Sequence, residues 1–104
     1  MGILYEVSQN RLEDVRDRLK SKKEGIAETD TSGNTALHLA AEKGFVEMVK
    51  LLVEFDAKLD SHNKSSGWTP LHFAAYEGNM KSYSKLILVL NFFFVLKEFK
   101  MWYN

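Results

Sequence analysis

The chain contains no cysteine, so disulfides, thiolate zinc sites, iron–sulfur clusters and a cysteine nucleophile are all excluded. It also has no excess of either charge, because 14 Lys and Arg residues balance 14 Asp and Glu residues among 104 positions. This balance disfavours recognition of nucleic acid by neutralisation of its phosphates. The first residues carry acidic side chains and no long apolar stretch, so we expect no secretory signal. Together with the missing cysteine, this indicates an intracellular protein, cytoplasmic or nuclear.

An apolar stretch long enough to cross a bilayer is missing as well. Residues 86–96 cover eleven positions and are interrupted by Asn91. A membrane-spanning helix needs roughly twenty apolar residues. The composition nevertheless changes here, since residues 86–104 are apolar at 14 of 19 positions. The helical spacing of these apolar residues predicts an amphipathic helix at the end of the chain.

Residue patterns that carry catalysis are also absent. The three histidines, His38, His62 and His72, show no short metal-ligand spacing, and no carboxylate is placed to complete a site with them. The sequence has no serine nucleophile elbow, no phosphate-binding glycine loop and no dinucleotide fingerprint. We therefore expect a protein that is not an enzyme, with no catalytic residue, no metal and no cofactor.

What the sequence does contain is an internal repeat. Residues 33–44 (GNTALHLAAEKG) align without a gap with residues 67–78 (GWTPLHFAAYEG), at a shift of 34 positions. A period of this length is typical of architectures in which one structural unit stacks on the next. The sequence therefore predicts a repeated unit rather than a single irregular core.

The residue type at each position of this unit has a physical reason. Gly33 and Gly67 follow polar residues and suit tight turns that need a positive φ. Thr35 and Thr69 fit helix N-caps, and Pro70 follows at a position where a missing N–H costs nothing. An apolar stripe and a terminating glycine complete a short first helix, and an amphipathic second helix follows. These further positions are Leu37, Ala40, Ala41, Gly44, Val46, Val49, Leu52 and Val53, with their counterparts Leu71, Ala74, Ala75, Gly78, Met80, Tyr83, Leu86 and Ile87.

The two segments resemble the ankyrin repeat, whose hallmark is Thr-Pro-Leu-His followed by Ala-Ala and Gly. The resemblance covers about sixty residues, roughly 30–90. It implies an all-α fold, a short ankyrin-like solenoid of stacked helix-turn-helix repeats joined by hairpin-like turns. The motif residues that it implies are Thr35, Leu37, His38, Gly44, Thr69, Pro70, Leu71, His72 and Gly78.

In this family the motif histidine is structural. The resemblance implies that His38 and His72 bond to the nearby Thr35 and Thr69 hydroxyls and to the backbone of the adjoining turn. The sequence also departs from the family pattern. Ala36 replaces the usual proline, Asp56 replaces the usual glycine, and one extra residue within 62–66 is expected to bulge the hairpin tip.

We expect four parts along the chain. Residues 1–29 form a degenerate N-terminal capping repeat with a helix pair near 2–20, residues 30–63 and 64–91 form two ankyrin-like repeats, and residues 92–104 form an apolar tail or capping helix. The tail has three interpretations. It covers the open end of the stack, it stays exposed and drives self-association or contact with a membrane, or the chain is a truncated form of a longer repeat protein.

The resemblance implies a non-catalytic adaptor or scaffold that binds an unidentified protein partner on its concave face. That face consists of the hairpin tips and the exposed sides of the first helices. The predicted partner-binding residues are Thr31, Ser32, Asn34, Glu42, Lys43, Ser65, Ser66, Trp68, Tyr76 and Glu77. Trp68 and Tyr76 are expected to anchor the partner, since large exposed aromatics often dominate binding energy. Trp68 packing only on its own turn is one alternative. A regulatory or membrane-peripheral role of the tail is the other.

Overall fold

The fold consists of short helices arranged in pairs. The computed structural model describes residues 2–21, 25–76 and 88. Within these residues there are five helices and no strand, as expected for an all-α repeat fold. The helices are α1 (Ile3–Ser8), α2 (Leu12–Ser21), α3 (Ala36–Lys43), α4 (Val46–Glu54) and α5 (Pro70–Tyr76).

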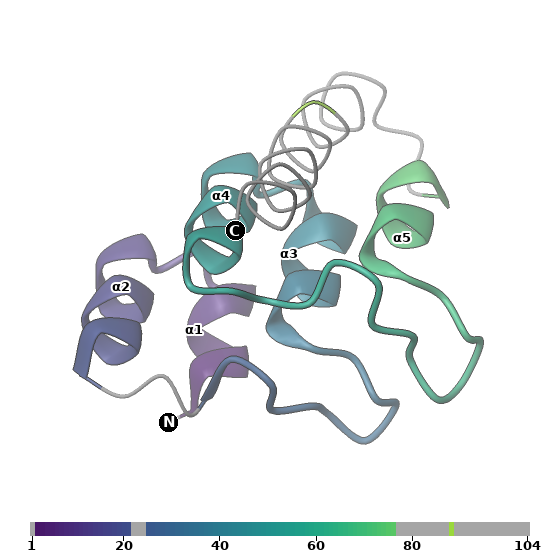
Figure 1. Cartoon of the computed structure of the whole chain (residues 1–104), viewed down its shortest axis with the longest axis horizontal. Coiled ribbons are helices and arrows are strands. Elements are labelled where there is room, and N and C mark those ends of the chain that lie inside the picture. Colours follow the sequence, from purple (N-terminus) through teal and green to yellow (C-terminus); the bar gives the residue numbers. More distant parts are fainter. Residues whose placement is uncertain (1, 22–24, 77–87, 89–104) are drawn as a thin grey trace, which may run out of the picture.

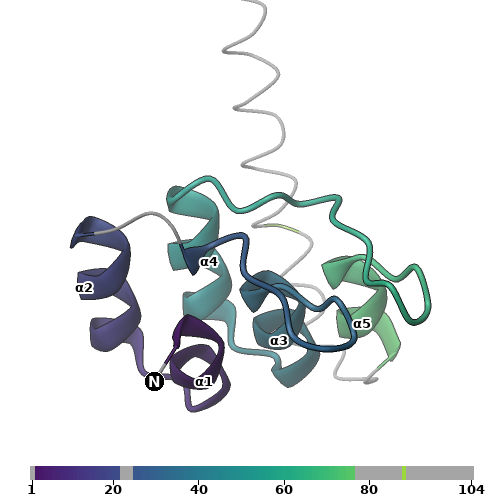
Figure 2. The ribbon, with the colours of Figure 1, turned by 90° about the horizontal axis from the view of Figure 1, so that it is seen from below.

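The helices lie in two rows. The first row holds α1, α3 and α5 side by side, and the second holds α2 and α4 (Figure 1, Figure 2). Two long loops, one before α3 and one before α5, project from the same end of the rows (Figure 1). Because α3 contacts α1, α4 and α5, it is the central helix of the described part of the stack.

The start of α3 follows from its capping residues. Thr35 has an extended backbone (φ −82, ψ 173), and its hydroxyl accepts a hydrogen bond from the His38 N–H at 3.3 Å. Gly44 ends the helix in the left-handed conformation, with φ 72. In the second copy, α5 begins at Pro70, and the Thr69 hydroxyl accepts from the His72 N–H at 3.4 Å. The same local sequence therefore builds the same helix start twice.

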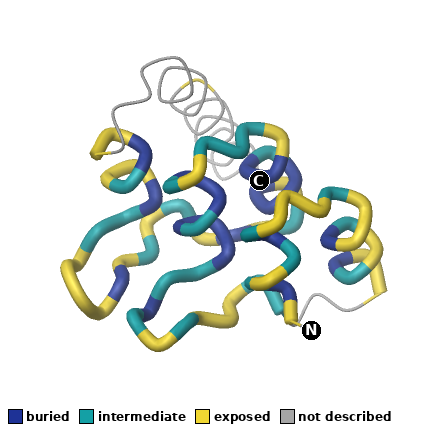
Figure 3. The backbone as a smooth tube through the Cα atoms, turned by 180° about the vertical axis from the view of Figure 1, so that it is seen from behind, coloured by how far each residue is buried: buried dark blue, intermediate teal, exposed yellow. Residues whose placement is uncertain are grey.

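The two projecting loops are hairpin-like turns of different length. In the first, the Gly33 N–H donates to the Asp30 carbonyl at 3.0 Å, across three residues. In the second, the Gly67 N–H donates to the Asn63 carbonyl at 3.0 Å, across four residues. The extra residue predicted for residues 62–66 thus lies inside the second turn. The tip of the second turn is exposed at residues 64–67, whereas in the first turn Thr31 is exposed and Gly33 is buried (Figure 3).

The core runs along the interface between the helix rows. The stripe predicted for α3 is buried, with Leu37 1% exposed. Of the face predicted for α4, Val49, Leu52 and Val53 are buried and Val46 is half-buried. Met48 and Leu51 of α4 are buried as well, although they lie outside the apolar stripe that the sequence predicts. Because α4 contacts both α2 and α3, more than one of its sides is covered.

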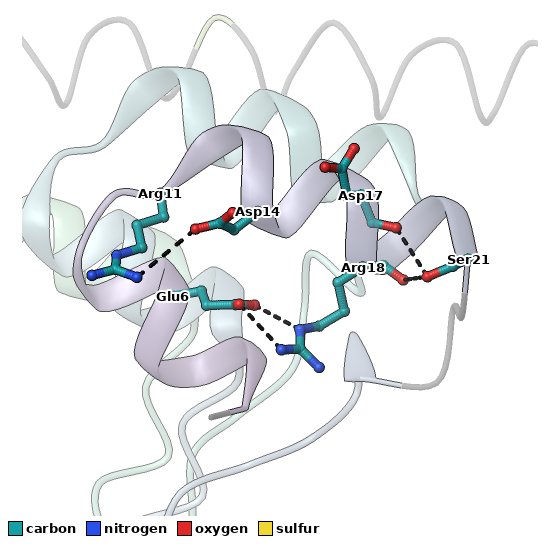
Figure 4. Close-up of polar contacts among 6 residues, drawn as sticks. All are labelled: Glu6, Arg11, Asp14, Asp17, Arg18 and Ser21. Atoms are coloured by element: carbon teal, nitrogen blue, oxygen red, sulfur yellow. Dashed lines mark hydrogen bonds and ion pairs between the residues drawn. The ribbon is translucent and has the colours of Figure 1, made fainter.

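The N-terminal helix pair has its own apolar and polar contacts. Ile3 and Val7 of α1 pack with Val15 and Leu19 of α2 in the buried cluster. In a part-buried ion pair, the Arg18 guanidinium donates to both carboxylate oxygens of Glu6, at 2.6 and 3.1 Å (Figure 4). This hydrogen bond from Arg18 lowers the pKa of Glu6 below its ordinary value. A bidentate ion pair therefore joins α1 to α2 in addition to their apolar contact.

Some of the predicted features fall on residues outside the described part of the chain. These are Glu77, Gly78, the second helix of the last repeat (Met80, Tyr83, Leu86 and Ile87) and the apolar tail 92–104. None of the helices in residues 2–21 and 25–76 is long and apolar enough to cross a membrane. The three interpretations of the tail remain predictions.

Candidate partner-binding face

His38 links two neighbouring repeats. Its Nδ1 accepts the backbone N–H of Thr35 at 3.1 Å and lies 2.9 Å from the Thr35 hydroxyl oxygen. Because a backbone N–H is always a donor, Nδ1 must be unprotonated and the ring proton lies on Nε2. Nε2 then donates to the Trp68 carbonyl, 2.8 Å away in the following hairpin. Both ring nitrogens are used in structural bonds, so His38 has none to offer as a metal ligand or a catalytic base.

The surroundings of His38 favour this neutral form. The residue is 1% exposed, and burial lowers its pKa below the ordinary value. Hydrogen bonds to the Trp68 and Ser61 backbone and the charge of Asp30 oppose this effect without overcoming it. A neutral ring is also what the Thr35 N–H requires at Nδ1.

A series of hydrogen bonds through the side chains of Asp30, Asn34 and Asn63 connects the two hairpins beside His38. Asp30 accepts the Ser32 and Asn34 backbone N–H groups at 2.9 Å each, and its second oxygen accepts the Asn34 amide at 3.2 Å. The side-chain oxygen of Asn34 (Oδ1) then accepts a hydrogen bond from the side-chain NH2 of buried Asn63 at 2.9 Å. Asn63 in turn accepts the Trp68 backbone N–H at 3.2 Å. Asn34, predicted as a partner-binding residue, therefore uses its side chain to join the hairpins.

At the position equivalent to Asn34, the second hairpin carries Trp68, which belongs to an aromatic cluster. Its ring centroid lies 5.1 Å from that of Tyr76 and 5.2 Å from that of Phe73. It also stacks on the His72 ring at 6.2 Å, with 27° between the planes. Trp68 is half-buried, whereas Tyr76 is 73% exposed. The two predicted anchors thus touch one another, and Trp68 both packs on its own repeat and keeps part of its surface in solvent.

The other predicted partner-binding residues lie at the hairpin tips and the end of α3. Thr31, Ser65 and Ser66 are exposed at the tips. Ser32 is half-buried, and its carbonyl accepts the Lys64 and Ser65 N–H groups at 3.0 and 3.3 Å. At the end of α3, Lys43 is exposed and Glu42 is half-buried. The structure brings Trp68 and Tyr76 together. The tip residues form a second group, in which the Ser32 carbonyl links the first turn to Lys64 and Ser65 of the second.

One depression was not predicted from the sequence. A cavity of about 520 Å³ lies between the segment that precedes α3 and the loop after α4. Asp56 helps to line it and has the left-handed conformation, with φ 68, where the repeat family usually has glycine. Its lining mixes both charges, and within the described residues no group of three or more histidines and carboxylates could hold a metal ion.

The fold and the motif define an ankyrin-repeat protein. A family model described as "Ankyrin repeats (3 copies)" matches residues 4–91, and the chain belongs to this family. Ankyrin repeats generally mediate protein–protein interaction. Membership of the family and similarity to regulatory subunits point to a non-catalytic protein.

Three relatives illustrate the similarity. Protein phosphatase 1 regulatory subunit 27 of Homo sapiens is 39% identical over 75 residues, covering 72% of this chain and 48% of that protein. Protein phosphatase 1 regulatory subunit 12A of Mus musculus is 42% identical over 69 residues, covering 64% of this chain and 6% of that protein. Notch-regulated ankyrin repeat-containing protein of Xenopus tropicalis is 49% identical over 47 residues, covering 45% of this chain and 40% of that protein. The match spans about half the length of these relatives or less.

Proposed function

We propose that this chain is an intracellular, non-catalytic adaptor that binds a protein partner on its concave face. The observation that carries the proposal is the contact between Trp68 and Tyr76, two large aromatics with solvent-accessible surface in the last described repeat. Rings held by their neighbours lose little conformational freedom on binding, and Trp and Tyr are enriched among residues that dominate interface energy. The absence of cysteine supports an intracellular location.

The anchor role is tested by removing both rings. Trp68→Ala with Tyr76→Ala should weaken partner binding by more than about tenfold, since hot-spot residues contribute about 2 kcal/mol or more each. The matched control is Tyr5→Ala, which removes a 39% exposed tyrosine of another first helix, α1, separated from α5 by α3, and so tests whether Trp68 and Tyr76 in particular carry the binding. Unchanged binding by the double variant would contradict the proposal.

The first probe for this experiment is suggested by the relatives. Two of them are named as regulatory subunits of protein phosphatase 1, so we propose protein phosphatase 1 as the first partner to test. Binding is measured by calorimetry with the full chain and purified phosphatase. If the phosphatase does not bind, the same three chains are compared by affinity purification and mass spectrometry, and only proteins lost with the double variant and kept with Tyr5→Ala count as partners.

A further inference from the structure

His38 and His72 have the same helix cap and different surroundings. In both, the backbone N–H of the threonine three positions earlier donates to Nδ1 at 3.1 Å, and the threonine hydroxyl oxygen lies 2.9 or 2.7 Å from Nδ1. The ring proton of His72 therefore lies on Nε2, as it does in His38. The Nε2–H of His38 donates to the Trp68 carbonyl, but within residues 2–21 and 25–76 no atom accepts a hydrogen bond from the Nε2–H of His72.

The face around His72 is exposed where the equivalent face of α3 is covered. Leu71 is 36% exposed, whereas its counterpart Leu37 is 1% exposed. Ala75 is exposed, whereas its counterpart Ala41 is 3% exposed. We call this surface the end face; it consists of Ser66, Trp68, Leu71, His72 and Ala75.

The end face holds its histidine in a defined orientation. The Nδ1 bonds fix one edge of the His72 ring, and the Trp68 ring stacks on its flat side at 6.2 Å. The Nε2–H group is thus a donor whose direction is set before any ligand arrives. A donor held in place in this way loses little entropy when it binds an acceptor.

The covered face of α3 shows what kind of structure binds to such a surface. His38 binds a turn of polypeptide, because its Nε2 donates to the Trp68 carbonyl and its ring lies against the edge of Phe73, with centroids 5.7 Å apart. The same turn donates its Lys64 N–H to the Ser32 carbonyl at 3.0 Å. The counterparts of His38 and Ser32 on the end face are His72 and the carbonyl of exposed Ser66.

We propose that the end face is a docking site for a turn in a partner protein. A main-chain carbonyl of that turn accepts the Nε2–H of His72, a main-chain N–H donates to the Ser66 carbonyl, and an apolar or aromatic side chain packs on Leu71 and Trp68. The inference rests on the proposed function, because it takes the partner to be a protein, and it adds a second contact beside Tyr76. Inside the chain, α3 and the turn before α5 form an interface of this kind. The end face presents the corresponding residues of the next repeat.

The turn before α5 of a second copy is not free to take this role. That turn already uses the Trp68 carbonyl for His38 of its own chain and the Lys64 N–H for its own Ser32. We commit to another protein with a free turn as the occupant, and self-association through the turn before α3 is an outcome that the test below separates.

The test uses the full chain and one synthetic probe. The probe is a peptide with the sequence of residues 60–76, which contains the turn that His38 receives and the following helix. Nitrogen-15 NMR of the imidazole groups reports the peptide at each histidine. We expect a saturable shift of His72 Nε2 and of the Trp68 indole, and no shift of exposed His62, which serves as the internal control.

Two variants separate hydrogen bonding from folding. His72→Asn keeps an acceptor near the position of Nδ1 but has no donor at Nε2, so peptide affinity should fall about fivefold, as expected for one net hydrogen bond. His72→Gln keeps a donor at the distal position and should restore part of this affinity. Circular dichroism melting of both variants checks that the helix pairs remain folded, and His62→Asn is the matched control.

Three results would overturn the inference. These are peptide shifts confined to His38, equal affinity of the wild type and His72→Asn, and self-association of the chain that His72→Asn abolishes. The experiment also separates the two proposals. If His72→Asn binds the partner as tightly as the wild type while Tyr76→Ala does not, the end face fails and the concave-face function stands.

Discussion

At the level of single residues, the same motif serves two different purposes. Thr35 and Thr69 cap their helices with the same geometry, yet His38 joins two repeats whereas His72 meets solvent. The difference comes from the neighbouring segment that packs on each unit and not from the motif itself. Substitutions at these positions are therefore expected to differ in their cost.

His38 is expected to make the stability of the protein depend on pH. Its pKa is lowered in the folded protein, from an ordinary value of 6.5. The unfolded chain therefore binds the proton first, and the free energy of unfolding should fall as the pH drops below 6.5 and through the lower folded pKa. The lowered pKa values of Glu6 and Asp30 act only below their ordinary values of 4.5 and 3.8.

The measurement is urea unfolding between about pH 7.5 and 5, a range chosen to lie mostly above the carboxylate transitions. His38→Asn should lower the free energy of unfolding at neutral pH by about 1 kcal/mol, because the Trp68 carbonyl loses one of its two donors and keeps the Asn63 N–H. It should also flatten the pH dependence. His62→Asn changes an exposed histidine whose charge adds a minor lowering of the His38 pKa, so it should leave the free energy of unfolding at neutral pH unchanged and alter the pH dependence much less than His38→Asn. A pH dependence that survives His38→Asn would assign the effect to other groups.

The two turn glycines are expected to tolerate alanine unequally. A Cβ on Gly33, at φ +83, would lie 2.7 Å from the Lys64 backbone nitrogen, whereas a Cβ on Gly67, at φ +73, would meet nothing within 4 Å. Gly67→Ala should cost about 1–2 kcal/mol for the left-handed backbone alone. Gly33→Ala should cost more, since the Lys64 main chain must move away from its bond to Ser32. Equal losses in urea unfolding would show that the hairpins do not approach this closely.

At the level of the elements, the beginning of α3 departs from the family and suggests a stabilising change. Ala36 occupies the first helical position, which Pro70 occupies in α5. Thr35 is already extended (φ −82, ψ 173), as a residue before proline must be. Ala36→Pro should therefore raise the free energy of unfolding by about 0.4–1 kcal/mol, by restricting the unfolded chain.

The control for this prediction is a proline inside the same helix. Ala40→Pro removes an internal hydrogen bond of α3 and should cost about 3 kcal/mol or more. Both variants are compared with the wild type by urea unfolding. A loss of stability in Ala36→Pro would mean that the buried space at Ala36 does not admit the ring that the equivalent site in α5 accepts.

At the level of the whole molecule, stability is a sum of contacts between neighbouring units. Among the described helices, α3 contacts α1, α4 and α5, whereas α1 and α5 lie at the two ends of their row (Figure 1). In a linear stack, the terminal units open without the centre, and the centre opens only with the whole. We expect the amides of α3 and α4 to show the slowest native-state hydrogen exchange, and those of α1 and α5 to exchange faster. Uniform protection across all described helices would contradict this gradient.

The sequence alone determined the repeat unit and its local geometry. The positive φ of Gly33 and Gly67, the threonine caps, the start of α5 at Pro70 and the left-handed Gly44 all depend on neighbours within a few residues. Such features arise from short-range sterics and hydrogen bonds, which are the same wherever the motif occurs. The family is identified by the same residues.

Only the tertiary structure decided which of these residues remain available for a partner. Asn34 resembles a free surface residue in the sequence, yet its amide group bonds to both Asp30 and Asn63, and Asn63 lies 29 positions after Asn34. Met48 lies outside the predicted apolar stripe and is nevertheless buried, because α4 contacts helices on two sides. Contacts between units depend on how one repeat lies on the next, and no local pattern encodes that. The exposure of His72 beside Trp68 likewise depends on contacts between repeats and not on the local sequence.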